Sequence, residues 1–585
     1  MVCTDEQQCV KEFSYINGTS ESHVFPTLNN CRLLCGKFGP LWPHPTGRVH
    51  LGKKTTAINP TTIKFEQYTN NQTAEAIKFL EEVENYFLLN LRRDYRIQML
   101  YSDSTPMSLI VKMHASSYSK TNIEWSTDES YKLKVSIENI TNVVAVIEAA
   151  TVFGVRHGCE TLLQLFTVVN EANFTSSLQM LSDAVITDQP AYAHRGLLID
   201  TARNYIPINC LKRQLDAMAA SKMNVLHWHV TDTQSFPIQL NRVPEMVSYG
   251  AYDSNQIYTS SDVRKLIRYA KYRGIRVILE LDAPAHAGNG WQWGPEKGLG
   301  NLAVCINQKP WRKFCIEPPC GQLNPVNPNL YAVLQDIYYD LAFINKDEQI
   351  LHMGGDEVFF GCWNATDEIV SYLVDHGMGR NETDFLMLWN EFQNNALRLW
   401  DNALYLVNTN RSSTTTSGKS KRTSPVILWS SHLTDPSVIV QFLSSDRYVI
   451  QTWVPSTNNM PQQLQKLGYK LIISTKDAWY LDHGFWGVTT YYNWKKVYEN
   501  QLPKGNGILG GEVCVWTEYI DAHSLDGRTW PRAAAAAERL WSNPSTKALE
   551  AESRFFRHRE RLISRGTQPE AIAPQWCQQN EGQCH

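Results

Sequence analysis

From about Ala193 onward, short aliphatic or β-branched runs alternate with segments of helical period. The eight runs are 196–200, 225–229, 277–282, 350–357, 426–429, 448–453, 471–474 and 508–512. Amphipathic segments such as 262–273 and 330–344 lie between them. This alternation is typical of parallel strands connected by helices. Eight such strands predict an α/β fold whose main unit is a closed (β/α)8 TIM barrel.

The first part of the chain breaks this rhythm. It holds turn-rich segments, a strand-like stretch at 132–136 and a helix-like stretch at 147–165. A chain of 585 residues is also too long for one ordinary hydrophobic core. We therefore expect a smaller α+β accessory domain at 1–190, followed at 191–585 by the catalytic barrel with C-terminal helices.

Charge and hydropathy exclude several classes of partner. The chain has 55 Lys and Arg against 58 Asp and Glu, so no net field attracts nucleic acid or an anionic membrane. No apolar stretch reaches the roughly 18 to 20 residues of a membrane span, and residues 1–5 do not resemble a signal peptide. The 18 Trp exceed the usual needs of a core, and sugar-stacking surfaces are one use for them. A neutral substrate fits this balance.

Cysteine spacing indicates an oxidising compartment. Eight of the 13 cysteines form local clusters, namely Cys3 with Cys9, Cys31 with Cys35, Cys315 with Cys320, and Cys577 with Cys584. None of these clusters has the spacing of a zinc site, so disulfides are expected. The candidates for free thiols are Cys159, Cys210 and Cys514. Seven Asn-x-Ser/Thr triplets begin at Asn17, Asn71, Asn139, Asn173, Asn364, Asn381 and Asn410. Together these features predict a secreted, extracellular or lysosomal protein.

Two adjacent carboxylates, Asp356 and Glu357, end the fourth run directly after two glycines. Functional groups of a barrel collect where its strands end, which singles out this pair. Adjacent residues of a strand point to opposite faces. They therefore cannot act as the usual glycosidase acid and nucleophile, which stand about 5 Å apart with the sugar between them. A different nucleophile is required.

The run 352–358 with Cys362-Trp363 resembles the signature of the family 20 glycoside hydrolases, the β-N-acetylhexosaminidases. The likeness extends to 195–203, 227–229, 282–286, 510–512, Trp516 and Glu518, and in the N-terminal part to 41–43, 153–154 and 160–162. It implies a retaining exo-enzyme that removes terminal N-acetylglucosamine or N-acetylgalactosamine from an oligosaccharide or glycan, without cofactor or metal. A homodimer is usual in the family and is expected here.

The resemblance assigns the chemistry. Glu357 is the general acid, and Asp356 holds the substrate's 2-acetamido group while its carbonyl attacks the anomeric carbon and forms an oxazolinium ion. Asp356 is therefore expected to be ionised, and Glu357 to be protonated through a raised pKa. His286 and Asp232 back the acid, and Tyr480 hydrogen-bonds the acetamido group.

The resemblance also assigns substrate contacts. The indoles of Trp429, Trp453 and Trp516 surround the sugar. Arg203, Glu518 and Asp482 bind its hydroxyls. Glu317 and Trp494 contact the leaving-group sugar. The segment 309–320 looks like a loop of arthropod chitin-degrading members. His483 stands where ganglioside-degrading members carry an Arg. Chitooligosaccharides or N-glycan termini are therefore the expected substrates.

Three other interpretations fit the sequence less well. A catalytically silent carbohydrate-binding homologue would have lost Asp356 or Glu357, and both are present. An endo-acting chitinase barrel would space its acids as DxxDxDxE, which does not occur here. His227 and His229 have the spacing of a metal pair, but the further Lys or His ligands of such barrels are missing, so packed, hydrogen-bonded histidines are favoured.

Overall fold

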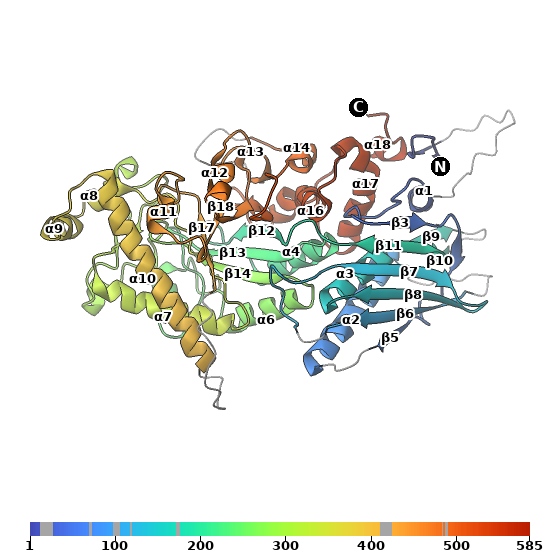
Figure 1. Ribbon diagram of the computed structural model, residues 1–585, viewed down its shortest axis with the longest axis horizontal. Coiled ribbons are helices and arrows are strands. Elements are labelled where there is room, and N and C mark those ends of the chain that lie inside the picture. The colour runs from blue at the N-terminus through green and yellow to red at the C-terminus, as the bar shows by residue number, and fades with distance from the viewer. Residues whose placement is uncertain are drawn as a thin grey trace.

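The computed structural model describes residues 1–11, 27–68, 73–96, 106–117, 120–170, 176–409, 424–482, 484–485 and 490–584. Figure 1 shows the two largest sheets side by side along the longest axis, the N-terminal one drawn in blue and cyan and a parallel one beginning in green. Among the described residues, no helix combines the length and the apolar character needed to cross a membrane. The architecture is therefore mixed α/β with an N-terminal accessory unit.

The N-terminal sheet has six strands in the order β3-β11-β7-β8-β6-β5. Their bounds are β3 Val49–Leu51, β5 Lys64–Tyr68, β6 Ser108–Ala115, β7 Tyr131–Ile137, β8 Asn142–Ala149 and β11 Ala184–Asp188. In β7, Leu133 and Val135 are buried while Lys132 and Lys134 are exposed, the alternation of a half-buried strand. The helices α2 (Ala74–Tyr95) and α3 (Val152–Leu163) pack together and share this core, with Phe79 of α2 edge-on to Phe153 of α3.

The second sheet has seven parallel strands in the order β14-β13-β12-β20-β19-β18-β17. They are β12 His194–Asp200, β13 Val225–Thr231, β14 Arg276–Leu281, β17 Val426–Trp429, β18 Tyr448–Thr452, β19 Lys470–Ile473 and β20 Ile508–Val515. All residues of β12 and β13 are buried, as expected for strands covered on both faces. Seven of the eight expected runs thus form extended strands.

The run 350–357 differs from the expectation. Only His352 forms ladder bridges, one to Glu280 of β14 and one to Ile427 of β17, the two edge strands of the sheet. Gly354 and Gly355 have φ values of +61° and +80°, which take the backbone out of the extended conformation. The segment is therefore a single bridging residue followed by a turn.

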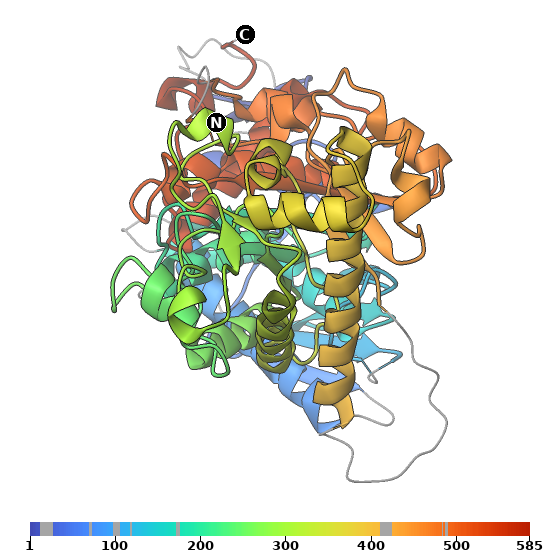
Figure 2. The same ribbon diagram turned by 90° about the vertical axis from the view of Figure 1, so that its left-hand side faces the viewer.

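Helices follow most of the parallel strands. They include α4 Ile208–Ala220, α6 Ser260–Lys271, α7 Pro328–Ile344, α10 Glu382–Thr409, α12 Met460–Lys466, α14 Trp494–Glu499 and α16 Arg532–Ser542. The expected helices at 262–273 and 330–344 correspond to α6 and α7. A capping box of Thr259 and Asp262 begins α6. The long helix α10 runs along one side of the molecule in Figure 2.

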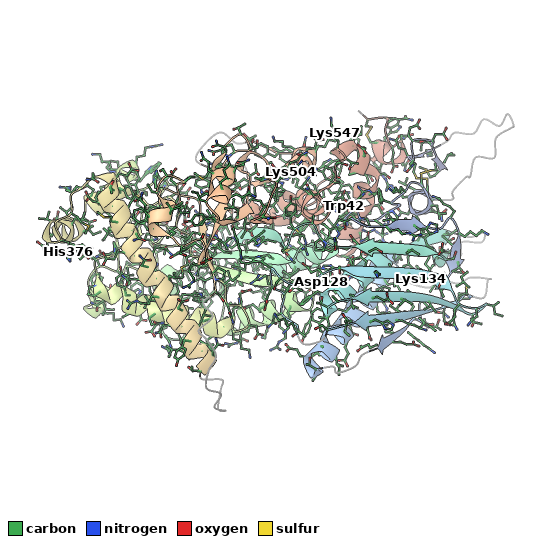
Figure 3. All side chains as sticks on the ribbon, viewed as in Figure 1. Trp42, Asp128, Lys134, His376, Lys504 and Lys547 are labelled. Atoms are coloured by element: carbon green, nitrogen blue, oxygen red, sulfur yellow. A yellow bond between two sulfur atoms is a disulfide. The ribbon has the colours of Figure 1, made fainter. Side chains whose placement is uncertain are left out.

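The C-terminal helix α17 (Ala548–Ser564) connects the two units. Arg565, its C-cap, pairs with Asp94 at 2.7 Å and Glu160 at 2.8 Å, both in the N-terminal unit. Trp42, labelled in Figure 3, is fully buried beside this helix and donates its indole N–H to the Ala534 carbonyl of α16. The strand bridge between Val10 and Asn580 also brings the two ends of the chain together.

Five disulfides close within the described residues. They are Cys3–Cys35, Cys9–Cys31, Cys305–Cys362, Cys315–Cys320 and Cys577–Cys584. The last two follow the sequence clusters, and the three candidates for free thiols, Cys159, Cys210 and Cys514, are all unpaired. The first two clusters are instead cross-linked to each other, because the β1–β2 hairpin (Val2–Cys3 and Cys9–Val10) lies against one face of α1 (Leu28–Leu34 with its C-cap Cys35).

Three of the seven glycosylation triplets begin within the described residues. Asn139 and Asn381 are exposed and Asn364 is half-buried. Asn17, Asn71, Asn173 and Asn410 lie outside the described residues.

Candidate active site

The candidate residues gather where the parallel strands end. Each segment that leaves the sheet contributes, with Arg203 after β12, Asp232 after β13, His286 after β14, Asp356 and Glu357 after His352, Trp429 on β17, Trp453 after β18, Tyr480 and Asp482 after β19, and Trp516 and Glu518 after β20. Parallel strands end at one edge, so the topology collects these side chains.

A tight turn carries the two carboxylates. The backbone N–H of Gly355 donates to Asp282 at 2.9 Å, and a Cβ added to Gly354 would lie 1.8 Å from the same carboxylate. Glu357 itself has a φ of +50°, a strained conformation for a side-chain-bearing residue. The expected strand alternation of Asp356 and Glu357 is therefore wrong, because this turn, and not a strand, sets their directions.

A chain of charged groups stands behind Glu357. Its carboxylate lies 3.5 Å from His286 Nε2, and His286 Nδ1 lies 3.1 Å from Asp232. Arg203 pairs with the other oxygen of Asp232 at 3.0 Å. Burial alone would raise the pKa of Asp232, but Arg203 and His286 hold it well below its usual range. Burial would lower the pKa of His286, but the charges of Asp232 and Asp282 outweigh it and raise this pKa well above its usual range, which favours the imidazolium form.

The pKa of Glu357 shifts in the direction opposite to the expected one, while Asp356 remains mostly ionised at neutral pH as expected. Burial raises the pKa of Asp356 to about 6, with the Glu357 charge adding to the shift and the His286 cation opposing it. Burial also acts on Glu357, but the adjacent His286 outweighs it and lowers the pKa of Glu357. The shift on Glu357 follows from its position, because the His286 ring faces its carboxylate directly at 3.5 Å and favours the ionised form.

Aromatic side chains line one side of the cluster. Trp429 is buried, and Trp453, Tyr480 and Trp516 pack around it with Cys514. The ring centroids of Trp429 and Trp516 are 5.9 Å apart, and those of Tyr480 and Trp516 are 6.4 Å apart. The indole N–H of Trp453 donates to the Ser430 carbonyl at 2.7 Å, which fixes its ring. This arrangement gives an apolar wall with fixed orientation.

Unsatisfied polar atoms face the same cluster. Arg203 Nε, Asp356 Oδ1 and Asp482 Oδ1 are buried without a hydrogen-bond partner among the described residues. Burial raises the pKa of Asp482 to about 6 and that of Glu518 to about 8. Buried polar groups of this kind require partners, and a polyhydroxylated ligand supplies both donors and acceptors.

A cross-linked loop reaches over Arg203. Glu317 lies between Cys315 and Cys320, and its carboxylate accepts a hydrogen bond from Arg203 at 2.7 Å. A second disulfide ties Cys305, at the start of this loop, to Cys362 just beyond the carboxylate turn. The structure therefore brings Glu317 into the cluster, as expected.

Trp494 is not brought to the cluster. It begins α14, is only 5% exposed, and its ring lies 4.5 Å from that of Phe555 on α17. The ring fills the core between outer helices, where no sugar can stack on it. His483 lies outside the described residues.

Comparison with known proteins settles the family. Residues 192–544 match the glycosyl hydrolase family 20 catalytic domain, and residues 41–165 match the domain described as β-acetyl hexosaminidase-like. The chain belongs to glycosyl hydrolase family 20. It is thus a β-N-acetylhexosaminidase, as its resemblance to the family predicted.

Curated relatives cover nearly the whole family 20 chain. It is 40% identical to a chitooligosaccharidolytic β-N-acetylglucosaminidase of Bombyx mori, over 96% of this chain and 91% of that protein. It is 38% identical to the enzyme of that description from Ostrinia furnacalis, over 99% and 95%. The human β-hexosaminidase subunit beta is 30% identical, over 92% and 90%. The Flavobacterium johnsoniae chitobiase structure, 24% identical, shares the fold with a TM-score of 0.69, over 90% of this chain and 73% of that one.

The interior of the parallel sheet holds buried charged residues that the sequence did not indicate as part of the site. His227, His229 and His352 all contact Glu280, and His227 also contacts Glu512. The favoured interpretation of packed, hydrogen-bonded histidines is confirmed for His227 and His229. The available signal was charged residues at inward-facing positions of otherwise apolar strands, a costly placement unless the charges are paired.

Proposed function

We propose that the enzyme releases terminal non-reducing N-acetylhexosamine from chitooligosaccharides, with the substrate's own acetamido group as nucleophile. The observation that carries this proposal is the turn that holds Asp356 and Glu357 between the imidazole of His286 and an aromatic wall. Because one turn carries both acids on neighbouring residues, the proposal takes the second required group from the sugar.

In this reaction, Asp356 and Tyr480 hold the acetamido group so that its carbonyl oxygen attacks the anomeric carbon. His286, 3.5 Å from Glu357, supplies the proton that Glu357 delivers to the leaving oxygen as the bond to that oxygen breaks, and Glu357 is left as a carboxylate. The ionised Asp356 stabilises the oxazolinium ion. Glu357 then takes a proton from water, which attacks the anomeric carbon, and the two inversions give net retention.

Polar groups opposite the aromatic wall suit a chain-terminal sugar. Arg203 and Glu518 are proposed to bind O3 and O4, and Asp482 to bind O6. Arg203 already lies over the ring of Trp516 at 5.0 Å, which fixes the guanidinium beside the wall. Groups that bind every outward hydroxyl of the sugar leave no room for a further residue, which favours exo-cleavage.

Chitooligosaccharides are the proposed substrates for two reasons. The relatives from Bombyx mori and Ostrinia furnacalis are both described as chitooligosaccharidolytic. Glu317 lies inside the small ring closed by Cys315–Cys320, on a loop that Cys305–Cys362 ties to the segment after the carboxylate turn, and it is proposed to contact the leaving-group sugar there.

The proposal includes an architecture and a setting. We propose a closed (β/α)8 barrel at 191–585, with His352 joining its two edge strands, and an accessory domain at 1–190. The five disulfides support a secreted or lysosomal location. Homodimer formation is also proposed, and sedimentation equilibrium of the full chain tests it.

Substrate comparison tests the proposed function. We expect chitobiose to be cleaved with a higher kcat/KM than a biantennary N-glycan. An aryl N-acetylglucosaminide should react roughly three orders of magnitude faster than the matching aryl glucoside, because only the acetamido sugar carries an internal nucleophile. Comparable rates on the two aryl glycosides would exclude acetamido participation, and a preference for the N-glycan would exclude the proposed substrate.

A pH profile tests the role of Asp356. Ionised Asp356 is needed to stabilise the oxazolinium, and its pKa lies at about 6 in the free enzyme. The kcat/KM for chitobiose should therefore fall as the pH is lowered through about 6. In the Asp356→Asn variant this limb should be absent from the residual activity. A wild-type kcat/KM that still rises on acidification below pH 5 would contradict the assignment.

A further inference from the structure

A buried chain of charges continues inward from the proposed acid. Beyond Asp232, its carboxylate meets His229 Nε2 at 2.8 Å, and His229 Nδ1 meets Glu280 at 2.5 Å. All three side chains are at most 2% exposed. Acids and bases therefore alternate from Glu357 to Glu280: hydrogen bonds join His286, Asp232, His229 and Glu280, and a 3.5 Å ion pair joins His286 to Glu357.

Glu280 reaches a second part of the site as well. Its other oxygen accepts the indole N–H of Trp429 at 2.7 Å and lies 3.1 Å from His352 Nδ1. Trp429 forms the centre of the aromatic wall. One buried carboxylate of β14 thus contacts both the chain behind the acid and the wall that faces the acetamido group.

The charges around this carboxylate are defined on every side. His229 and His227 of β13 and His352 face Glu280, while Asp282 and Asp356 add negative charge from the site. Burial would lower the pKa of His229, but the carboxylates of Glu280 and Asp232 outweigh it and raise this pKa well above its usual range. The ring of Trp516 packs edge-on against the His229 ring. The protonated ring can donate from both nitrogens, one to each carboxylate.

We propose that Glu280 is a positioning residue for this reaction, holding the acid through His229 and Asp232 and the acetamido-facing wall through Trp429. The inference rests on the proposed substrate-assisted mechanism. Without the Glu280 carboxylate, the protonated form of His229 is destabilised, because a buried cation is costly without its counter-charge. Asp232 then loses a charged partner, and the His286–Glu357 pair loses its fixed orientation and proton supply.

Glu280→Gln is the direct test, because the amide oxygen can still accept from Trp429 while the charge is removed. Kinetics are measured on aryl N-acetylglucosaminides ranging from dinitrophenyl to poor leaving groups. A dinitrophenolate leaves without an acid, so its kcat should stay within about threefold of wild type. For the poorest leaving group the kcat should fall about 10- to 100-fold, a part of what general acid catalysis contributes.

Glu512→Gln is the matched control. Glu512 is equally buried and also lies between two histidines, His227 at 2.6 Å and His194 at 2.9 Å, but it touches neither Asp232 nor Trp429. Both variants should lower the thermal unfolding midpoint. Only Glu280→Gln should steepen the dependence on the leaving group, and a steepening of the same size in Glu512→Gln would overturn the proposal.

His229→Gln separates the two arms and decides the case if Glu280→Gln does not fold. It breaks the chain to the acid while Glu280 keeps Trp429. We expect kcat of His229→Gln to depend on the leaving group as steeply as kcat of Glu280→Gln does. Its affinity for a thiazoline analogue of the oxazolinium intermediate should equal that of wild type. Uniform losses across all leaving groups would show a purely structural role. The aryl series tests the role of Glu280 even if chitobiose is not the preferred substrate. A failure of this inference can therefore be told apart from a failure of the proposed substrate.

Discussion

Replacing Glu357 with Gln should lower kcat for chitobiose by about 10³- to 10⁴-fold while KM changes little. The amide keeps the shape of the side chain but has no proton to deliver to the leaving oxygen, and general acid catalysis contributes about this much. The sugar leaving group of chitobiose is poor, so the full contribution of general acid catalysis appears in kcat. Steady-state rates of reducing-sugar release measure the loss.

An activated substrate provides the internal control for Glu357→Gln. With a dinitrophenyl N-acetylglucosaminide the first step needs no acid, so the variant should retain most of its rate of aryl release. External azide should accelerate turnover, because a small anion attacks the oxazolinium without the base that water needs. Equal losses on chitobiose and on the dinitrophenyl substrate would remove Glu357 from the role of acid.

The sequence predicted the parallel strands well because burial on both faces leaves a continuous apolar run. Residues 225–229 form part of β13 as expected. Residues 350–357 carry a similar run, yet Gly354 and Gly355 adopt left-handed conformations and only His352 pairs with the neighbouring strands. The glycines were visible in the sequence, but their backbone angles are set by the close approach of Asp282, a contact 73 residues away in the chain.

The candidate site followed from motifs, whereas its protonation did not. Motif resemblance named Asp356 and Glu357, but which of them holds a proton depends on the 3.5 Å separation of Glu357 and His286. The misplacement of Trp494 has a similar origin, since only the packing of α14 on Phe555 reveals its burial. Glu280 was missed because its role comes from contacts with three other segments, which no local pattern records.

Replacing Asp356 with Asn should have two effects of opposite sign. It should lower kcat by about 10²- to 10³-fold, because the oxazolinium loses the anion that stabilises it. It should also stabilise the fold at neutral pH. Burial raises the pKa of Asp356 to about 6, above the roughly 3.9 of an unfolded chain, so the folded state binds this proton more tightly.

The sign of the stability effect follows from that difference. As the pH rises from about 4 to 6, the wild type loses stability by ionising a buried carboxylate, and above about 6 the loss is complete at up to about 3 kcal/mol. The neutral Asn carries no such cost. The unfolding midpoint of Asp356→Asn should therefore exceed that of wild type at pH 7.5, and the difference should shrink towards pH 4.5.

Asp477→Asn is a control of opposite sign for this comparison. Hydrogen bonds from Ser456 outweigh the burial of Asp477 and lower its pKa, so its charge is favoured in the folded state. Removing that charge should lower the midpoint at pH 7.5. If Asp356→Asn is no more stable than wild type at pH 7.5, ionised Asp356 is not strained by its site. The stabilisation of the oxazolinium would then have to come from Tyr480 and the aromatic wall. A carboxylate that is already stable in the free enzyme gains less interaction free energy when the cation forms.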